Sequence, residues 1–401
     1  MKEKRKRAAP TVRKQILSIV LIVLLAGVIG FASVYIFYST GHDAEDPMGF
    51  HSIRGLNNVE DMVQIGDTKW ILAGNLGDKS WKKGGLYLID SDSYEWKEAE
   101  IDFSGPVAED CEKIADPELF SSHGIALKPI DENRFEAYAV NHGGRESVEI
   151  FDLTIQDDTP EIAWKGSLPT PYGLRGNAVA PLSDGFLVTI PMMESNPGTF
   201  LSFLAGRPTG AVYKWTVREG FREIPGGRLA GNNGIAVSPD EKWAFINGYS
   251  NRSVTRISLV DDQVEPVTAS VSFLPDNIRY SADGTLLVTG QDTNILTVVL
   301  LTNGTGIGVS PSDTSVARLD PDTMEVTEVL KLPKFRAFGG GTTALYVDND
   351  LWISSFRAQR IMILPEARYI TFSPEPNVVL NSIHARKNYP IPEAQSQNDH
   401  I

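Results

Sequence analysis

Cysteine is almost absent from this 401-residue chain, in which Cys111 is the single example. One thiol excludes any disulfide within the chain, so the fold must be held by its apolar core and by whatever groups it binds. Cys111 also lies in no paired motif of the kind that binds zinc or carries out redox chemistry. We therefore interpret it as a structural or incidental thiol.

The common motifs of several enzyme classes are missing as well. The sequence contains no nucleophile elbow, Walker loop, zinc cluster or dinucleotide fingerprint. A covalent serine mechanism is therefore not indicated. The absence of a Walker loop and of a dinucleotide fingerprint likewise gives no sign of a nucleotide site.

Basic charge is scarce beyond the N-terminus. The first 14 residues hold seven bases and one acid, a net charge of +6, so the remaining chain carries about −20. Such acidity disfavours nucleic acid as a partner, because the phosphates would be repelled. It agrees with the binding of cations without demonstrating it.

One long apolar run is present. Residues 16–38 form an uncharged stretch of 23 residues, which is long enough to cross a bilayer. A cleaved signal peptide would have a shorter apolar core and a clear site of small residues. We predict a signal anchor that keeps the basic tail 1–15 in the cytoplasm and places the rest on the periplasmic, extracellular or lumenal side. Residues 39–50 would be a tether, and 390–401 a polar tail.

Between these ends, five short polar signatures recur, each at the start of a strand-like run. They are Glu60-Asp61, His123-Gly124, Asn177, Asn233-Gly234 and Asp276-Asn277, with spacings of 63, 54 and 56 residues and, from Asn233 to Asn277, 44 residues. Further strand-like runs and Gly-, Asp- or Asn-containing turns follow each of them. A sixth unit opens at Gly341 without an obvious metal ligand. This recurrence predicts an all-β fold, a six-bladed β-propeller over residues 51–389.

The signatures begin the innermost strands of the predicted blades, so they should ring one end of the central channel. Four of the five carry carboxylate or amide oxygens, which are the ligands that calcium prefers. The predicted ligands of one Ca²⁺ ion are Glu60, Asn177, Asn233, Asp276 and Asn277. The alternative is that each residue only makes the turn before its strand, which explains one position better than it explains five equivalent ones.

Two histidines accompany these residues. His123 shares the inner-strand position, and His142 ends the next strand of the same unit, in AVNHGG. Adjacent antiparallel strands would bring the imidazoles together, with one acting as general base on a water and the other tuning it. The alternative is a hydrogen-bonded structural histidine at a strand end, and spacing alone does not separate the two.

Six segments together resemble a known family. They are VEDMV, SHGIALKP, AVNHGGRESVEIFDL, GNAVA, NNGIAVSPDEKWAFI and LPDNIRYSADGTLLVTG. Over residues 55–364 the chain resembles the paraoxonases, calcium-dependent arylesterases and lactonases within the wider SMP-30, gluconolactonase and strictosidine-synthase-like propellers. The resemblance implies that the five predicted ligands hold a catalytic calcium that polarises an ester or lactone carbonyl. It also implies that His123 is the base of a dyad with His142.

The chain departs from this family at one predicted ion site. The resemblance implies a second, structural calcium held by Asp61, the backbone of Ile125 and an acid at position 178, but Ala178 stands there. The sequence therefore lacks one of the ligands that the resemblance implies for a second calcium.

The segment Pro191–Pro208 is an apolar insertion, and its core, TFLSFLAG, is too apolar for a free loop. It is interpreted as a lid over the channel, as a membrane contact beside the N-terminal helix, or as packing on the propeller face. A lid of this composition favours hydrophobic substrates.

The sequence thus predicts a membrane-anchored, calcium-dependent hydrolase of lactones or aryl esters. One alternative is a hydrolase of sugar lactones, as in gluconolactonases. A second, from another class, is a metal-containing propeller that binds ligands without catalysis.

Overall fold

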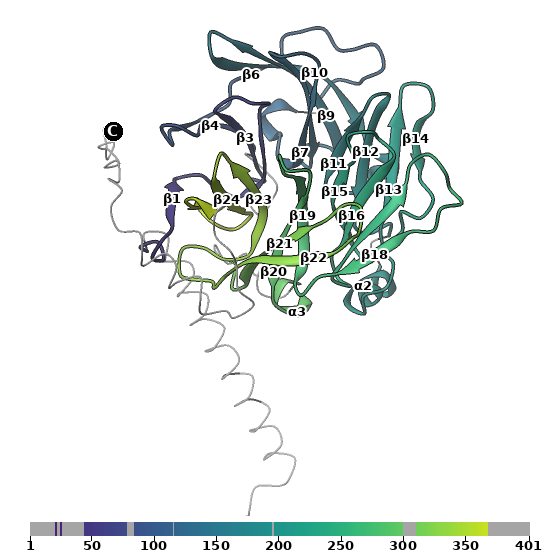
Figure 1. Cartoon of the computed structure of the whole chain (residues 1–401). Helices are drawn as coiled ribbons and strands as arrows, with labels where there is room; N and C mark the ends of the chain where they lie inside the picture. Colours follow the sequence, from purple (N-terminus) through teal and green to yellow (C-terminus); the bar gives the residue numbers. More distant parts are fainter. Residues whose placement is uncertain are drawn as a thin grey trace, which may run out of the picture.

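The structure is a computed structural model that describes residues 44–77, 84–114, 116–194, 196–299 and 310–367, together with Leu21 and Leu25. It is an all-β, propeller-like fold in which consecutive antiparallel strands form sheets around a common centre (Figure 1). The predicted basic tail, membrane anchor and C-terminal polar tail lie outside the described residues, apart from those two leucines, and so does the first part of the tether. Among the described residues, no helix has the length and apolar character needed to span a bilayer.

Three sheets are four-stranded meanders in sequence order. Their strands are β11 (Val179–Leu182), β12 (Gly185–Ile190), β13 (Ala211–Thr216) and β14 (Gly220–Glu223); β15 (Asn232–Val237), β16 (Trp243–Gly248), β17 (Ser253–Ser258) and β18 (Val267–Ser270); and β19 (Leu274–Tyr280), β20 (Leu286–Asp292), β21 (Asp313–Leu319) and β22 (Val326–Leu332). A fourth sheet has five strands. These are β7 (Ser122–Pro129), β8 (Arg134–Asn141), β9 (Ser147–Gln156), β10 (Thr159–Pro169) and β6 (Ile101–Asp102), the last pairing parallel to β10.

The fifth sheet has eight strands and consists of two four-stranded units. One contains β2 (Val59–Gln64), β3 (Trp70–Asn75), β4 (Gly85–Asp90) and β5 (Trp96–Glu98); the other contains β23 (Gly341–Val347), β24 (Asp350–Ser355), β25 (Arg360–Leu364) and β1 (His51–Arg54). A single bridge, from Val59 to Ser355, joins the units. The first strand, β1, pairs with the last, β25, with His51 opposite Ile363. The two ends of the strand-bearing region are therefore held together by β1. The sequence also predicts a closing strand around residues 377–380, which lie outside the described residues.

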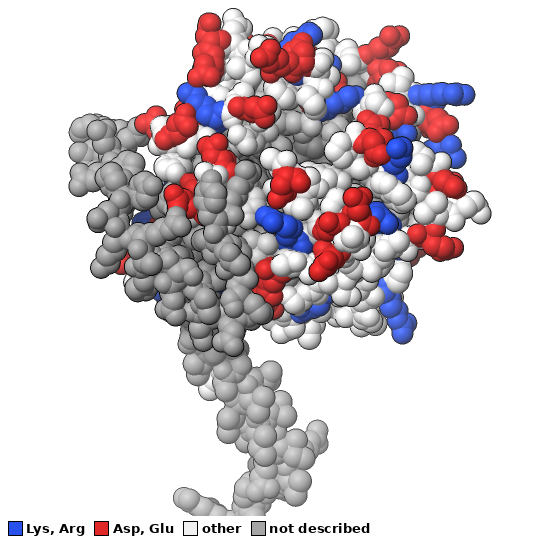
Figure 2. All heavy atoms as spheres, viewed as in Figure 1, with Lys and Arg blue, Asp and Glu red and all other residues white. Residues whose placement is uncertain are grey.

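The helical elements are short. They are α2 (Pro197–Leu204), α3 (Ile295–Thr297) and the 3₁₀ turns η1 (Pro117–Leu119) and η2 (Pro171–Gly173). Figure 1 shows α2 and α3 together at one end of the molecule. Charged side chains of both signs are interspersed over the face drawn in Figure 2.

The apolar core lies between successive sheets. Leu187 of β12 and Ile246 of β16, for example, share one buried cluster, and Val288 of β20 belongs to the next. Because each sheet buries apolar side chains against its neighbours, the polar side chains at the inner strands are left to line the centre. Apolar burial therefore fixes the positions of the strands that carry the predicted ligands.

Each inner strand that carries a signature within it is interrupted by a β-bulge at that signature. The pairing register shifts between Val59 and Asp61, between Ser122 and Ile125, between Asn232 and Ile235, and between Pro275 and Ile278. The inner strand of the sixth unit shifts in the same way, between Gly341 and Ala344. A bulge removes a residue from the ladder and redirects its side chain. This explains why the signature residues face neighbouring units instead of pairing within their own sheet.

Glycines next to two signatures allow the inner strands to approach one another. A Cβ atom on Gly124 would lie 2.6 Å from the carbonyl oxygen of Asn177, and one on Gly234 would lie 2.5 Å from that of Asp276. Gly124 instead donates its N–H to the Asn177 carbonyl at 2.9 Å. Each of these glycines therefore abuts the signature of the next unit.

Candidate functional site

Glu60 lies at the centre of the polar network. Its side chain is buried, and Oε1 accepts a hydrogen bond from Asn277 Nδ2 at 2.9 Å and lies 3.6 Å from Nε2 of His123. The backbone carbonyl of Glu60 accepts hydrogen bonds from the hydroxyls of Thr342 and Thr343 at 2.6 and 3.1 Å. The strand β23, which opens the predicted sixth unit and has no obvious ligand in the sequence, thus holds the backbone of Glu60 in place.

Asp276 is fixed from the opposite side of the network. Its Oδ2 accepts a hydrogen bond from Gln291 Nε2 at 2.6 Å, and the Asn233 side chain also hydrogen-bonds to it. Gln291 donates in addition to the carbonyl of Gly341, at 3.0 Å. Gln291 was not identified from the sequence, because it lies on β20, the second strand of its unit, and not at a signature.

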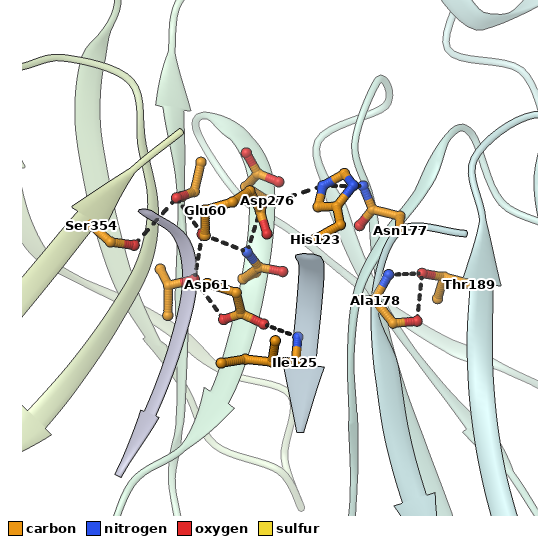
Figure 3. A network of polar contacts seen from close by, with 12 residues as sticks. Glu60, Asp61, His123, Ile125, Asn177, Ala178, Thr189, Asp276 and Ser354 are labelled. Carbon is orange, nitrogen blue, oxygen red and sulfur yellow. Dashed lines mark hydrogen bonds and ion pairs between the residues drawn. The ribbon is translucent and has the colours of Figure 1, made fainter. Parts of the chain in front are cut away.

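The last predicted ligand, Asn177, completes the network through His123. Its Nδ2 lies 3.3 Å from Nε2 of His123. Figure 3 shows Glu60, Asp276, His123 and Asn177 close together at one end of their strands, with Asp61 and Ile125 further along. The structure therefore brings all five predicted calcium ligands and His123 into one connected site.

Three oxygens of this site are buried without any hydrogen-bond partner. They are Glu60 Oε2, Asn177 Oδ1 and Asn233 Oδ1. A buried acceptor left without a donor costs about 1–3 kcal/mol, so three in one network favour a bound positive group. Carboxylate and amide oxygens are the donors that suit a hard cation such as Ca²⁺, and the residues present fit that ion. Within the described ranges, no group of three or more His, Cys, Asp or Glu side chains forms a metal site, so amide oxygens would have to complete this one.

Burial, reinforced by the neighbouring Glu60 carboxylate, raises the pKa of Asp276 to about 8 in the metal-free protein. At neutral pH the metal-free side chain is therefore largely protonated, and a cation must displace that proton to bind.

We expect calcium affinity to rise with pH as a result. Between the ordinary pKa of an aspartate and about 8, each unit of pH should strengthen binding by about tenfold, the signature of one displaced proton. Calorimetric titration at pH 6, 7 and 8 measures this dependence. The Asp276→Asn variant is the control, because it has no proton to lose and should bind weakly with little pH dependence. A wild-type affinity that is constant over this range would contradict the prediction.

The two predicted histidines are in direct contact. Nδ1 of His123 lies 2.7 Å from Nε2 of His142, and the rings are inclined at 64°. Nδ1 of His142 lies 2.7 Å from Oε2 of Glu146, whose other oxygen is 3.2 Å from Nε of Arg175. Glu146 was not identified from the sequence, because a glutamate in the segment HGGRES is not distinguished from an ordinary charged residue of a turn. His123, His142 and Glu146 therefore form a three-membered relay, with the Glu146 carboxylate at its outer end.

This relay determines where the protons lie. A carboxylate accepts only, so we assign the His142 proton to Nδ1, which leaves Nε2 of His142 as the acceptor for Nδ1–H of His123. Burial lowers the pKa of His142 to about 4, so His142 is neutral at pH 7 and carries this single proton. Nε2 of His123 then presents a lone pair toward the predicted ion site.

The pKa of His123 moves in the opposite direction. Burial alone would lower this pKa, but the carboxylates of Glu60, Asp276 and Asp61 together more than offset burial, and the net pKa is raised above its ordinary value. A histidine with such surroundings can hold a proton taken from water.

Another buried carboxylate, that of Glu149, supports the turn that carries His142. Glu149 is fully buried and accepts hydrogen bonds from the hydroxyls of Ser147 and Ser167 at 2.6 and 2.9 Å, and from the indole N–H of Trp164 at 2.9 Å. It also accepts one from Asn141 Nδ2 at 3.2 Å. The carbonyl of the Asn141 side chain in turn binds the N–H groups of Ser121 and Gly143, on either side of the histidine pair. Ser147 and Glu149, which lie in the segment AVNHGGRESVEIFDL, thus help to position the turn that carries His142.

The predicted second calcium does not fit the residues present. Asp61 and the carbonyl of Ile125 are both bound by the guanidinium of Arg279, and Ala178 offers no side-chain oxygen.

The predicted insertion, Pro191–Pro208, contains α2 and packs close to the site. Phe203 of α2 stacks on Tyr249 with a ring separation of 6.3 Å, and the Tyr249 hydroxyl donates to Gln291, the residue that holds Asp276. On the outer side of the helix Leu201 is 65% exposed and Phe200 39% exposed. The insertion is therefore packed on the propeller face by one side, while its other side is apolar and accessible.

No protein-family model matches the chain, and no curated protein matches its sequence. Among solved structures, a luciferin-regenerating enzyme is similar at 12% identity over 78% of this chain and 94% of that one, with a TM-score of 0.48. A putative gluconolactonase is similar at 13% identity over 79% and 92%, with a TM-score of 0.48. Regucalcin from Agrobacterium tumefaciens, described as a calcium-binding protein, is similar at 11% identity over 78% and 92%, with a TM-score of 0.45. None of these three is a paraoxonase, and at such values no activity or residue role carries over, so both must come from this chain's own geometry.

Proposed function

We propose that this protein is a calcium-dependent hydrolase of lactones and aryl esters, built on a six-bladed propeller. The observation that carries the proposal is the juxtaposition of three unpartnered buried oxygens with the base end of the His123–His142–Glu146 relay. A cation site beside a general base is the arrangement that water-mediated cleavage of a carbonyl compound requires. The sixth blade is the unit β23, β24, β25 and β1.

A calcium ion held by Glu60, Asn177, Asn233, Asp276 and Asn277 would supply a Lewis acid for a substrate carbonyl. His123 accepts a proton through Nε2 from a water molecule as that water attacks the carbonyl carbon. His142 and Glu146 stabilise the resulting imidazolium, because the positive charge spreads toward the Glu146 carboxylate 2.7 Å away from His142. The same proton passes from His123 to the leaving alkoxide as the C–O bond breaks, which regenerates the neutral base.

The apolar outer side of α2 supports a hydrophobic substrate. Exposed Leu201 and Phe200 belong to the same helix as Phe203, which packs through Tyr249 and Gln291 toward Asp276. We propose that this surface receives apolar substrates, and that residues 16–38 anchor the chain so that the propeller faces away from the cytoplasm. The same surface would lie against the membrane if Pro191–Pro208 is a second contact.

The direct test is a panel of aryl esters, aliphatic lactones and sugar lactones, assayed with the metal content of the protein measured in parallel. We expect one bound calcium, hydrolysis of the apolar substrates, and loss of that hydrolysis when a chelator is added. A preference for hydroxylated lactones would favour the sugar-lactone alternative. Metal without hydrolysis of any of these substrates would favour a binding module and contradict the proposal.

A further inference from the structure

The guanidinium of Arg279 joins three inner strands at a point below the proposed calcium site. Arg279 is on β19, two residues after Asn277, and its Nη2 donates to Oδ2 of Asp61 on β2 and, at 2.6 Å, to the carbonyl of Ile125 on β7. The backbone N–H of Ile125 donates to the same Asp61 oxygen at 2.9 Å. One cationic group thus ties together strands that are far apart in the sequence.

Asp61 is fully buried, and all but one of the donors described at its carboxylate come from other strands of the ring. Its Oδ1 accepts hydrogen bonds from the Thr343 hydroxyl and from the N–H of Met62, each at 2.9 Å. A buried carboxylate of this kind is tolerated only when it is paired and hydrogen-bonded. Arg279 supplies the positive charge, while Thr343 and the backbone supply the remaining donors.

The two oxygens that Arg279 binds are the two that the family resemblance assigns to a second calcium. The third oxygen expected for such a cation is absent, because Ala178 has only a methyl side chain. That alanine is buried in an apolar cluster with Ile235, and its N–H binds the Thr189 hydroxyl at 3.0 Å. One carboxylate and one carbonyl, both already bonded to a guanidinium, do not make a calcium site, since calcium takes six to eight oxygens.

A guanidinium differs from a bound ion in two respects. It cannot dissociate from the protein, and it remains protonated at any pH at which the protein is folded. Arg279 also borders a cavity of about 520 Å³ at the other end of the inner strands, lined mainly by apolar residues such as Ala126, Val179 and Ile235. Its side chain is only 16% exposed, so the guanidinium interacts mainly with the buried Asp61 carboxylate and little with solvent.

We infer that Arg279 is a permanent internal cation that takes the structural role of a second metal ion, which is to bridge Asp61 and the carbonyl of Ile125. It fixes the positions of Asp61 and Ile125 relative to one another without calcium. It is a positioning residue for Glu60, because Asp61 adjoins Glu60 within the bulge of β2 and Ile125 follows His123 by two residues on β7. The inference rests on these contacts and does not depend on hydrolysis.

The first test counts calcium ions in the full-length chain. Equilibrium dialysis should give no more than one ion per wild-type chain, and the same number for Asp61→Asn. Two ions in the wild type, with one of them lost in Asp61→Asn, would overturn the inference.

The second test is a double-mutant cycle on thermal stability. Arg279→Met leaves Asp61 buried without its cation, and we expect the Tm to fall by roughly 5 °C or more. The double variant Asp61→Asn/Arg279→Met removes the unpaired charge and should recover most of that loss. It also keeps the test informative if the single variant does not fold. Lys128→Met is the matched control, because Lys128 borders the same cavity but its Nζ donates to the exposed carbonyl of Ser183, at 3.1 Å, and not to a buried carboxylate.

Calcium affinity supplies a readout that a purely structural role would not move. It should weaken at least several-fold in Arg279→Met and recover in the double variant. A Tm equal to that of the wild type in Arg279→Met, or a double variant no more stable than the single one, would overturn the inference. A protein that shows the expected cycle but hydrolyses nothing would defeat the proposed function and leave this inference standing.

Discussion

Replacing Glu60 by glutamine is expected to weaken calcium binding by about 100-fold or more, since a charge-assisted contact with a buried carboxylate contributes up to about 3 kcal/mol. Hydrolysis should be lost in proportion. Glutamine has nearly the same shape, so the apolar core is undisturbed. It brings an N–H₂ group, which cannot bind a cation, to a position where Oε1 now accepts from Asn277 and Oε2 has no partner.

The measurement is calcium titration of the variant together with its rate on the preferred ester. Asp67→Asn is the matched control, because it makes the same kind of change at an exposed residue in the turn after β2. It should leave both affinity and rate unchanged. If Glu60→Gln binds calcium as tightly as the wild type, the ion is held elsewhere and the assignment of the five ligands is incorrect.

Replacing His123 by glutamine is expected to lower kcat by about 10²–10⁴-fold while calcium still binds, since this is the usual contribution of a general base. The separation of the two effects follows from the geometry. Nε2 of His123 lies beside the ion site, 3.6 Å from Oε1 of Glu60, but it does not supply one of the unpartnered oxygens.

The Glu146→Gln variant tests the outer end of the relay. The amide oxygen can still accept the Nδ1 proton of His142, but the negative charge that favours the imidazolium is gone, so we expect a smaller loss of about tenfold or more. Single-turnover rates and calcium affinities for both variants distinguish this relay from a structural histidine pair. If His123→Gln retains full kcat, or loses calcium to the same extent as activity, the proposed base role fails.

Much of the site could be predicted from the sequence because its residues occupy one point in a repeated pattern. Glu60, Asn233 and Asp276 each precede an alternating apolar run, and apolar burial between sheets fixes where such runs lie. The β-bulges at those residues could not be predicted, because the register of a strand depends on its pairing partner and not on its own residues. The bulges are nevertheless what turns the predicted ligands toward one another.

Other parts of the site carried no recognisable signal. Arg279 is one residue of an ordinary strand, and only the arrangement of β2, β7 and β19 shows that its guanidinium reaches Asp61. Thr342 lies in an unremarkable unit, and its contact with Glu60 joins residues 282 positions apart. Glu146 becomes meaningful only once His142 is known to contact His123. The second calcium was expected from resemblance, and the residues that would hold it are occupied by Arg279.

The pairing of β1 with β25 has a consequence for synthesis. During translation the chain can bury its successive sheets as they emerge, since each is a meander of local contacts. Asn277 can meet Glu60 only after β19 has been made and Thr342 only after β23, and β1 must wait for β25, which ends at Leu364. The proposed ion site can therefore form only after β19 has been made, and the contacts that fix Glu60 are complete only after β23. An ion that binds only this completed site would stabilise the folded form by mass action. Its binding would therefore mark the stage at which β2, an early strand, has met the late strands β19 and β23.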